Sequence, residues 1–142
     1  MKKIFAVLIL GIVILGCNNN SKVSENPFQD EKSPAIELNG GQKWIVNEEM
    51  KPYINKAKSL TNDYLQNKST DYVTLAQQLK KQNDQLIKSC TMDGKAHDEL
   101  HKWLHPHMIL VSHLEKAETA AKADAIVLSI KDSFETFERY FE

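Results

Sequence analysis

The chain of 142 residues is poor in the residue types that mark specialised classes of protein. Its two cysteines, four prolines and five glycines exclude a disulfide-rich scaffold, a collagen-like chain and a low-complexity disordered chain. Its formal net charge is −1, whereas a nucleic-acid-binding protein needs a basic surface to neutralise phosphates. We therefore expect no nucleic-acid partner.

Motifs of the common enzyme classes are also missing. The sequence has no phosphate-binding loop, dinucleotide-binding fingerprint or nucleophile elbow. Residues 97–101 are similar to the His-Glu-x-x-His helix of zinc proteases, but Asp98 stands where that motif has its catalytic glutamate. Because aspartate is one methylene shorter, its carboxylate would be misplaced as a general base. We expect that the protein is not an enzyme.

Long apolar runs are scarce, and the one at the start of the chain is short. It covers the thirteen residues 4–16 and follows the positive start Met1-Lys2-Lys3. As a helix it would rise only ~20 Å, less than the ~30 Å hydrocarbon core of a membrane. A basic start followed by a short apolar run is typical of a secretory signal peptide.

The apolar run ends in Ile14-Leu15-Gly16-Cys17, which resembles the lipobox of bacterial lipoproteins, although Leu15 stands where a smaller residue is usual. The resemblance implies cleavage before Cys17 and a lipid, such as palmitate chains on a diacylglycerol, at its sulfur. By the same analogy Asn18 favours the outer membrane in a cell with two membranes. Several acyl chains anchor a protein stably, whereas one binds marginally. We expect a cell-envelope lipoprotein held to the membrane by its lipid; an ordinary signal peptide with an incidental cysteine is the alternative.

The sequence divides into three parts. Residues 1–16 form the expected signal peptide, residues 17–35 the lipidated cysteine with a flexible linker, and residues 36–142 the folded domain. The linker is polar and contains two prolines, so it cannot bury enough surface to order itself. Asn39-Gly40, between short apolar pieces, predicts a strap or hairpin, with Trp44 packed onto the domain.

Four segments repeat apolar residues with the 3.6-residue period of an amphipathic helix. They cover roughly residues 48–66, 71–90, 95–121 and 124 onward, with Asn47 as the expected N-cap of the first and Pro106 as a kink in the third. Short connections between such helices predict an all-α, up-down-up-down four-helix bundle. One continuous helix from 95 to 141, in a three-helix or dimeric form, is the alternative.

Four potential metal ligands lie around the second connection. If Cys17 is lipidated, Cys90 is the only thiol left and an intrachain disulfide is impossible. The bundle topology brings Cys90, Met92, His97 and His101 to one end, and the two histidines are one helical turn apart. Thiolate, thioether and imidazole suit Cu(I), so we predict a copper site for buffering or transfer. In the alternative interpretation the sulfurs are core residues and the histidines lie on the surface.

His107 occupies a core position directly after Pro106. The structural interpretation is a buried histidine bonded to a backbone carbonyl that the proline frees. The alternative is an axial ligand of a b-type haem, opposed by Met50 or another side chain within the bundle, and His107 and Met50 are possible additional metal ligands. A further alternative is a non-catalytic structural lipoprotein that binds an envelope protein partner and no metal.

Residues 36–142 are also similar to small helical envelope lipoproteins that share the pattern Cys-Thr-Met…His…Leu-His-x-Trp-Leu-x-Pro-His. In this sequence the pattern is made by Cys90, Met92, His97, Leu100, His101, Trp103, Leu104, Pro106 and His107. The resemblance implies the boundaries of the domain but brings no activity with it.

Overall fold

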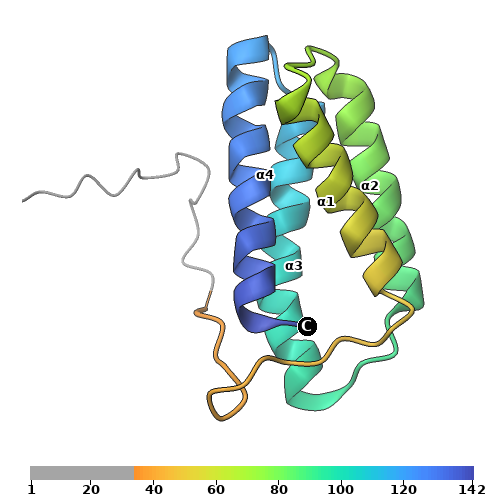
Figure 1. The fold of residues 1–142 in the computed structure, drawn as a ribbon, viewed down its shortest axis with the longest axis vertical. Coiled ribbons are helices and arrows are strands. Elements are labelled where there is room, and N and C mark those ends of the chain that lie inside the picture. Colours follow the sequence, from red (N-terminus) through yellow and green to blue (C-terminus); the bar gives the residue numbers. More distant parts are fainter. Residues whose placement is uncertain (1–33) are drawn as a thin grey trace, which may run out of the picture.

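Four helices make up the domain. The computed structural model describes residues 34–142, so the predicted signal peptide, Cys17 and nearly all of the linker lie outside the described residues. The helices are α1 (Lys51–Gln66), α2 (Tyr72–Ser89), α3 (Gly94–Glu115) and α4 (Ala120–Tyr140), and they alternate in direction (Figure 1). The predicted all-α, up-down-up-down four-helix bundle is confirmed.

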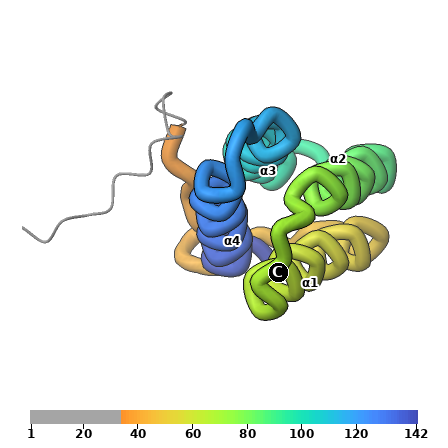
Figure 2. Tube along the Cα trace, turned by 90° about the horizontal axis from the view of Figure 1, so that it is seen from above, coloured from red at the N-terminus to blue at the C-terminus, as the bar shows by residue number. Residues whose placement is uncertain are grey.

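The helices form a ring in which each packs on its neighbours in the chain and α4 closes onto α1 (Figure 2). The basal end of the bundle holds the strap (residues 34–50), the α2–α3 connection and the C-terminus (Figure 1). The distal end holds the other two connections. Within residues 34–142, no helix combines the length and the apolar character that a membrane span requires.

The start of α1 differs from the prediction. The helix begins at Lys51 rather than near residue 48, and its N-cap, Met50, makes no side-chain cap bond. Pro52 is the cause, because a proline lacks an N–H and its ring clashes with the carbonyl four residues earlier. It therefore fits only in the first turn. Asn47, predicted as the N-cap, instead forms side-chain hydrogen bonds to the backbone of Ser89 and Thr91.

The break between α3 and α4 also comes earlier than predicted. The third helix ends at Glu115 rather than near residue 121, and α4 begins at Ala120. Thr119 caps α4, since its hydroxyl oxygen accepts a hydrogen bond of 3.2 Å from the Lys122 N–H. Ala121 is exposed in the first turn of α4. The alternative of one continuous helix is wrong.

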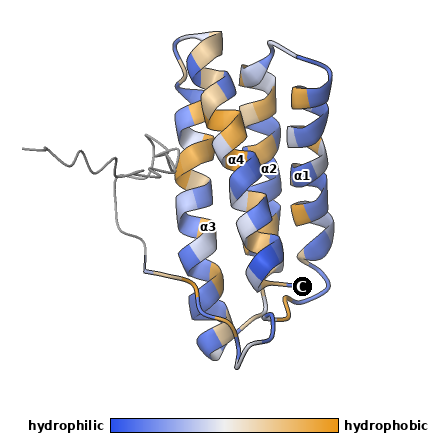
Figure 3. Ribbon diagram, turned by 60° about the vertical axis from the view of Figure 1, so that its left-hand side comes forward, coloured by the Kyte–Doolittle hydropathy of each residue, from blue (hydrophilic) through white to orange (hydrophobic). Residues whose placement is uncertain are grey.

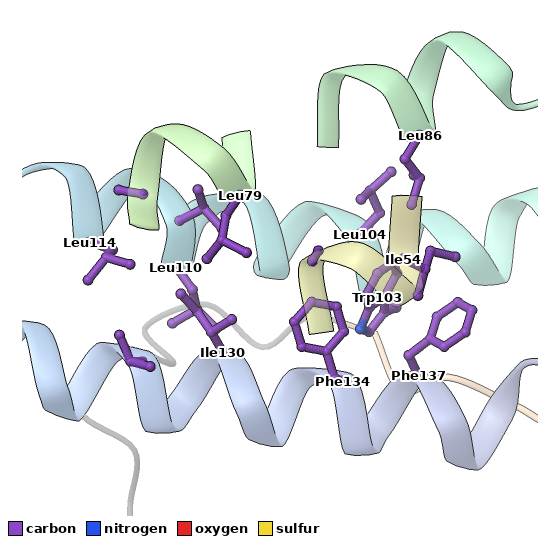
Figure 4. Packing of buried hydrophobic residues seen from close by; sticks show 14 of the residues in the cluster. Ile54, Leu79, Leu86, Trp103, Leu104, Leu110, Leu114, Ile130, Phe134 and Phe137 are labelled. Carbon is purple, nitrogen blue, oxygen red and sulfur yellow. The ribbon is translucent and has the colours of Figure 1, made fainter. Parts of the chain in front are cut away.

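The apolar stripes of the helices meet in one core. Figure 3 shows that hydrophobic and hydrophilic residues alternate along each helix, and Figure 4 shows the side chains of Leu79, Leu104 and Phe134 meeting in the core from three helices. Trp103 is buried there, and its indole N–H donates to the backbone oxygen of Ser133 at 2.8 Å. Asn83, which shares the apolar face of α2, is also buried.

The strap crosses the basal end and pairs with the last residues of the chain. The Trp44 N–H donates to the Tyr140 oxygen at 2.8 Å, and the Glu142 N–H donates to the Trp44 oxygen at 2.9 Å. The expected hairpin is reduced to one bridged pair, Asn39 and Gln42. Trp44 is buried against the bundle, as predicted. The strap therefore joins the N-terminal and C-terminal segments of the domain at the basal end of the bundle.

Candidate metal site at the basal end

His97 and His101 lie together in the first turns of α3, at the basal end. Their Nε2 atoms are 3.0 Å apart, and their rings meet edge to face with centroids 4.5 Å apart. The contact follows from the helix, since residues four apart lie one above the other on the same face. His101 is exposed and His97 half-buried, so the pair is open to solvent.

The spacing of the two nitrogens is that of a chelate. With metal–nitrogen bonds of about 2.0–2.1 Å, a separation of 3.0 Å gives an N–metal–N angle of about 95°. Adjacent positions of a tetragonal Cu(II) site have about this angle. In the structure the two Nε2 atoms share a hydrogen bond whose donor depends on the tautomer, and a bound ion would take the place of that hydrogen bond.

The two sulfur residues lie at the same end but behave as apolar side chains. Cys90 caps α2, Met92 follows in the connection, and both are half-buried and packed against the core. Among residues 34–142, no three His, Cys, Asp or Glu side chains gather into a group that could hold one metal ion. The structure therefore brings His97 and His101 together and does not add Cys90 to them.

His107 is completely buried beside aromatic rings. Trp103 stacks on it with centroids 5.0 Å apart, and Phe134 packs against it at 4.8 Å. The burial of His107 was predicted correctly. The predicted hydrogen bond to a backbone carbonyl is wrong, because Nδ1 shares a hydrogen bond of 3.1 Å with the Ser133 hydroxyl instead. A porphyrin would have to displace this packing, so the structural interpretation of His107 is favoured over the axial ligand.

Met50 does not oppose His107 in the structure. Met50 is buried directly before α1 at the basal end, whereas His107 is thirteen residues along α3 from Gly94, a rise of about 20 Å. The two residues proposed as additional ligands thus lie at different levels of the bundle.

The burial of His107 has an electrostatic consequence. Desolvation lowers its pKa from 6.5 to about 4, so the ring is neutral at neutral pH. Its Nε2 atom is buried and has no hydrogen-bond partner within the described part of the chain.

Glu99 fastens the strap, a role that the sequence reasoning missed. Its side chain is almost fully buried, and it accepts the Glu37 N–H at 2.8 Å and the Lys102 ammonium at 2.7 Å. Burial would raise the pKa of Glu99, but these two hydrogen bonds and the charges of Lys102 and Lys95 outweigh it and hold the pKa below 4.5. The available signal was its position beside Leu100 and three residues before Lys102.

Asn47 brackets the connection that carries Cys90. Its side-chain amide donates to the Ser89 oxygen at 3.0 Å, and its side-chain oxygen accepts the Thr91 N–H at 3.2 Å. These bonds join the strap to the residues on either side of Cys90. No periodic pattern marks such a contact, because its partners are 42 and 44 residues away.

An open hollow of about 270 Å³ lies at the distal end. It is lined by His113, Lys116, Ala117, Glu118, Lys122 and Ile126. Lys122 forms an ion pair of 2.6 Å with Glu118, so its charge is offset locally. None of the residues predicted for the metal site lines this hollow.

No family model matches the chain, and neither a curated protein nor a solved structure shows significant similarity to it. The arrangement of its own residues is therefore what supports a function.

Proposed function

We propose that this chain is a bacterial envelope lipoprotein, anchored through Cys17, whose helical bundle binds copper for buffering or transfer. His97 and His101 hold the ion at the basal end. The observation that carries the proposal is the pair of Nε2 atoms 3.0 Å apart on an accessible face of α3. The lipid anchor is supported by the lipobox resemblance at residues 14–17.

The donor set supports copper over other divalent ions. Imidazole nitrogen suits the later transition metals, and among these the divalent ion that such sites bind most strongly is Cu(II). The angle of about 95° fits two adjacent positions of its tetragonal geometry. Cys90 and Met92 lie at the same end of the bundle and are proposed as additional sulfur donors for Cu(I) alone, because the structure does not group Cys90 with the two histidines.

An accessible two-residue chelate suits exchange better than permanent storage. Structural metal sites in proteins are closed by four protein ligands, whereas this pair leaves coordination positions open. Because one bundle does not enclose the ion, the ion can be released without unfolding that bundle. Buffering and transfer are the functions that such a site supports.

Calorimetric titration with Cu(II) tests the proposal through a matched pair of variants. H97A and H105A each remove one imidazole from the same helix, and each leaves two histidines four residues apart. We expect H97A to weaken binding by about tenfold or more and H105A to leave it unchanged. Equal affinities for H97A and the unmodified chain would contradict the proposed site.

The role of the sulfur donors is tested separately with Cu(I). A titration against a competing chelator under anaerobic, reducing conditions compares C90A with the unmodified chain. We expect C90A to weaken Cu(I) binding while its Cu(II) affinity stays the same. An unchanged Cu(I) affinity would restrict the site to the two histidines.

The second candidate function is the docking of an envelope protein partner. Ile45 is 70% exposed, while Trp44 and Val46 on either side of it are buried. An extended segment turns successive side chains to opposite faces, so Ile45 points away from the bundle. A photocrosslinker at position 45 should then capture one specific partner in cells, and the same probe at the exposed Leu128 should not.

A further inference from the structure

The histidine pair is an incomplete metal site. His97 and His101 supply two ligands, whereas zinc and copper sites in proteins generally have three or four protein ligands. Within residues 34–142, no third His, Cys, Asp or Glu side chain joins them. The remaining ligands then come from water or from another molecule.

The face next to the pair can be traced along the bundle. The Lys80–Glu115 ion pair, at 3.7 Å, shows which sides of α2 and α3 meet at the surface. One heptad closer to the basal end, on the same sides, are Ile87 and Met108, and both are exposed. His101 precedes Met108 by a further seven residues. The exposed apolar residues Ile87 and Met108 therefore lie on the same side of the bundle as His101, closer to the distal end.

We propose that two copies of this chain share one metal ion, each contributing His97 and His101. The inference rests on the proposed function and identifies the partner that completes its site. A two-fold axis through the ion gives four imidazole ligands and places the same surface of each copy against the other. Ile87 and Met108 then lie about 10 Å along the bundle from His101, on the surface that the second copy covers.

Attachment to a membrane favours this pairing. Removal of residues 1–16 takes away two lysines and no acidic residue, so the expected mature chain has a net charge of −3. Two such chains repel only weakly, and the divalent ion between them offsets part of that charge. Tethering to one surface raises the effective concentration of each copy for the other.

Sedimentation velocity of the full chain in density-matched detergent tests the inference. Cu(II), and Zn(II) as a second probe, are added and then removed with EDTA, while calorimetry gives the number of ions per chain. We expect a reversible shift from monomer to dimer with one ion per two chains. H97A should stay monomeric, and H113A, which removes an imidazole near the other end of α3, should dimerise like the unmodified chain.

A second variant tests the apolar contact independently of the ligands. M108E places a charge on the proposed interface and leaves both histidines in place. We expect it to bind metal but to dimerise at least tenfold more weakly than the unmodified chain. Equal dimerisation of M108E would overturn the proposed interface.

The outcomes separate this inference from the proposed function. One ion bound per monomeric chain would overturn the shared site and leave the copper function standing. A dimer that forms equally in EDTA would overturn the bridging role of the metal. Absence of any metal binding would overturn the inference and the proposed function together.

Discussion

At the scale of single residues, His107 links burial to pH. Its pKa in the folded chain is about 4, below the ordinary value of 6.5, because burial disfavours the charged ring. As pH falls, the unfolded chain therefore takes up this proton first. The stability that the neutral ring contributes is complete above about pH 6.5 and is lost as pH falls toward 4, by about 2 kcal/mol at pH 5.

The H107F variant should remove this pH dependence. Phenylalanine keeps an aromatic ring beside Trp103 and Phe134 but has no titrating group. Between pH 8 and pH 5, we expect the free energy of unfolding to fall by about 2 kcal/mol more in the unmodified chain than in H107F. Urea unfolding at the two pH values measures the difference. A constant offset between the two proteins would show that His107 does not titrate as proposed.

At the scale of elements, the strap depends on one buried carboxylate. Removing the Glu99 side chain in E99A leaves the Glu37 N–H and the Lys102 ammonium without this partner. We expect a loss of roughly 2 kcal/mol in the free energy of unfolding. Amide exchange at Glu37 should become faster.

The E99Q variant is the matched control for the strap. Glutamine keeps an oxygen acceptor but loses the charge that pairs with Lys102. E99Q should therefore fall between E99A and the unmodified chain in stability. If E99A leaves the exchange of Glu37 unchanged, the carboxylate does not hold the strap.

Asn47 offers a test of two different roles. Its two side-chain hydrogen bonds hold the α2–α3 connection in place. N47A should therefore speed amide exchange at Thr91 and lower the free energy of unfolding by about 1–2 kcal/mol. If Asn47 acted as a helix N-cap, N47A would instead speed the exchange of the first amides of α1. Hydrogen exchange followed residue by residue distinguishes the two, and faster exchange confined to α1 would refute the bracket.

The elements show what a local pattern can predict. The number, direction and inward faces of the helices follow from periodicity, which each segment carries by itself. The predicted helix boundaries were less accurate. Pro52 makes α1 begin later than predicted, and the Thr119 cap makes α4 begin before the apolar pattern changes. A terminus depends on one or two residues, whereas a helical face is repeated over many.

At the scale of the whole molecule, the strap and the C-terminus close the basal end together. Phe141 is buried and stacks on Phe137 with centroids 5.1 Å apart, beside the strap residue Trp44 that it pairs with. F141A should lower the free energy of unfolding by about 3 kcal/mol through the cavity it leaves. L128A, at an exposed position of α4, should change it by less than about 0.5 kcal/mol. Similar urea midpoints for the two variants would contradict this closure.

The candidate site was predictable only in its local part. His97 and His101 are neighbours because of helical geometry, so their contact could be inferred from a spacing of four. The arrangement of Cys90 and Met92 depends on a connection held by Asn47 from a distant segment. The partner of His107 comes from another helix, so no spacing within α3 could reveal Ser133.

Copper binding at His97 and His101 is the proposal on which the other functional inferences depend, and ¹⁵N NMR of all five histidines follows it at the ring nitrogens themselves. Titration of the ¹⁵N-labelled chain with Cu(I) under anaerobic conditions follows each ring nitrogen separately. We expect the Nε2 resonances of His97 and His101 to shift together while those of His105, His107 and His113 stay in place. Shifts confined to other histidines, or no shift at all, would contradict it.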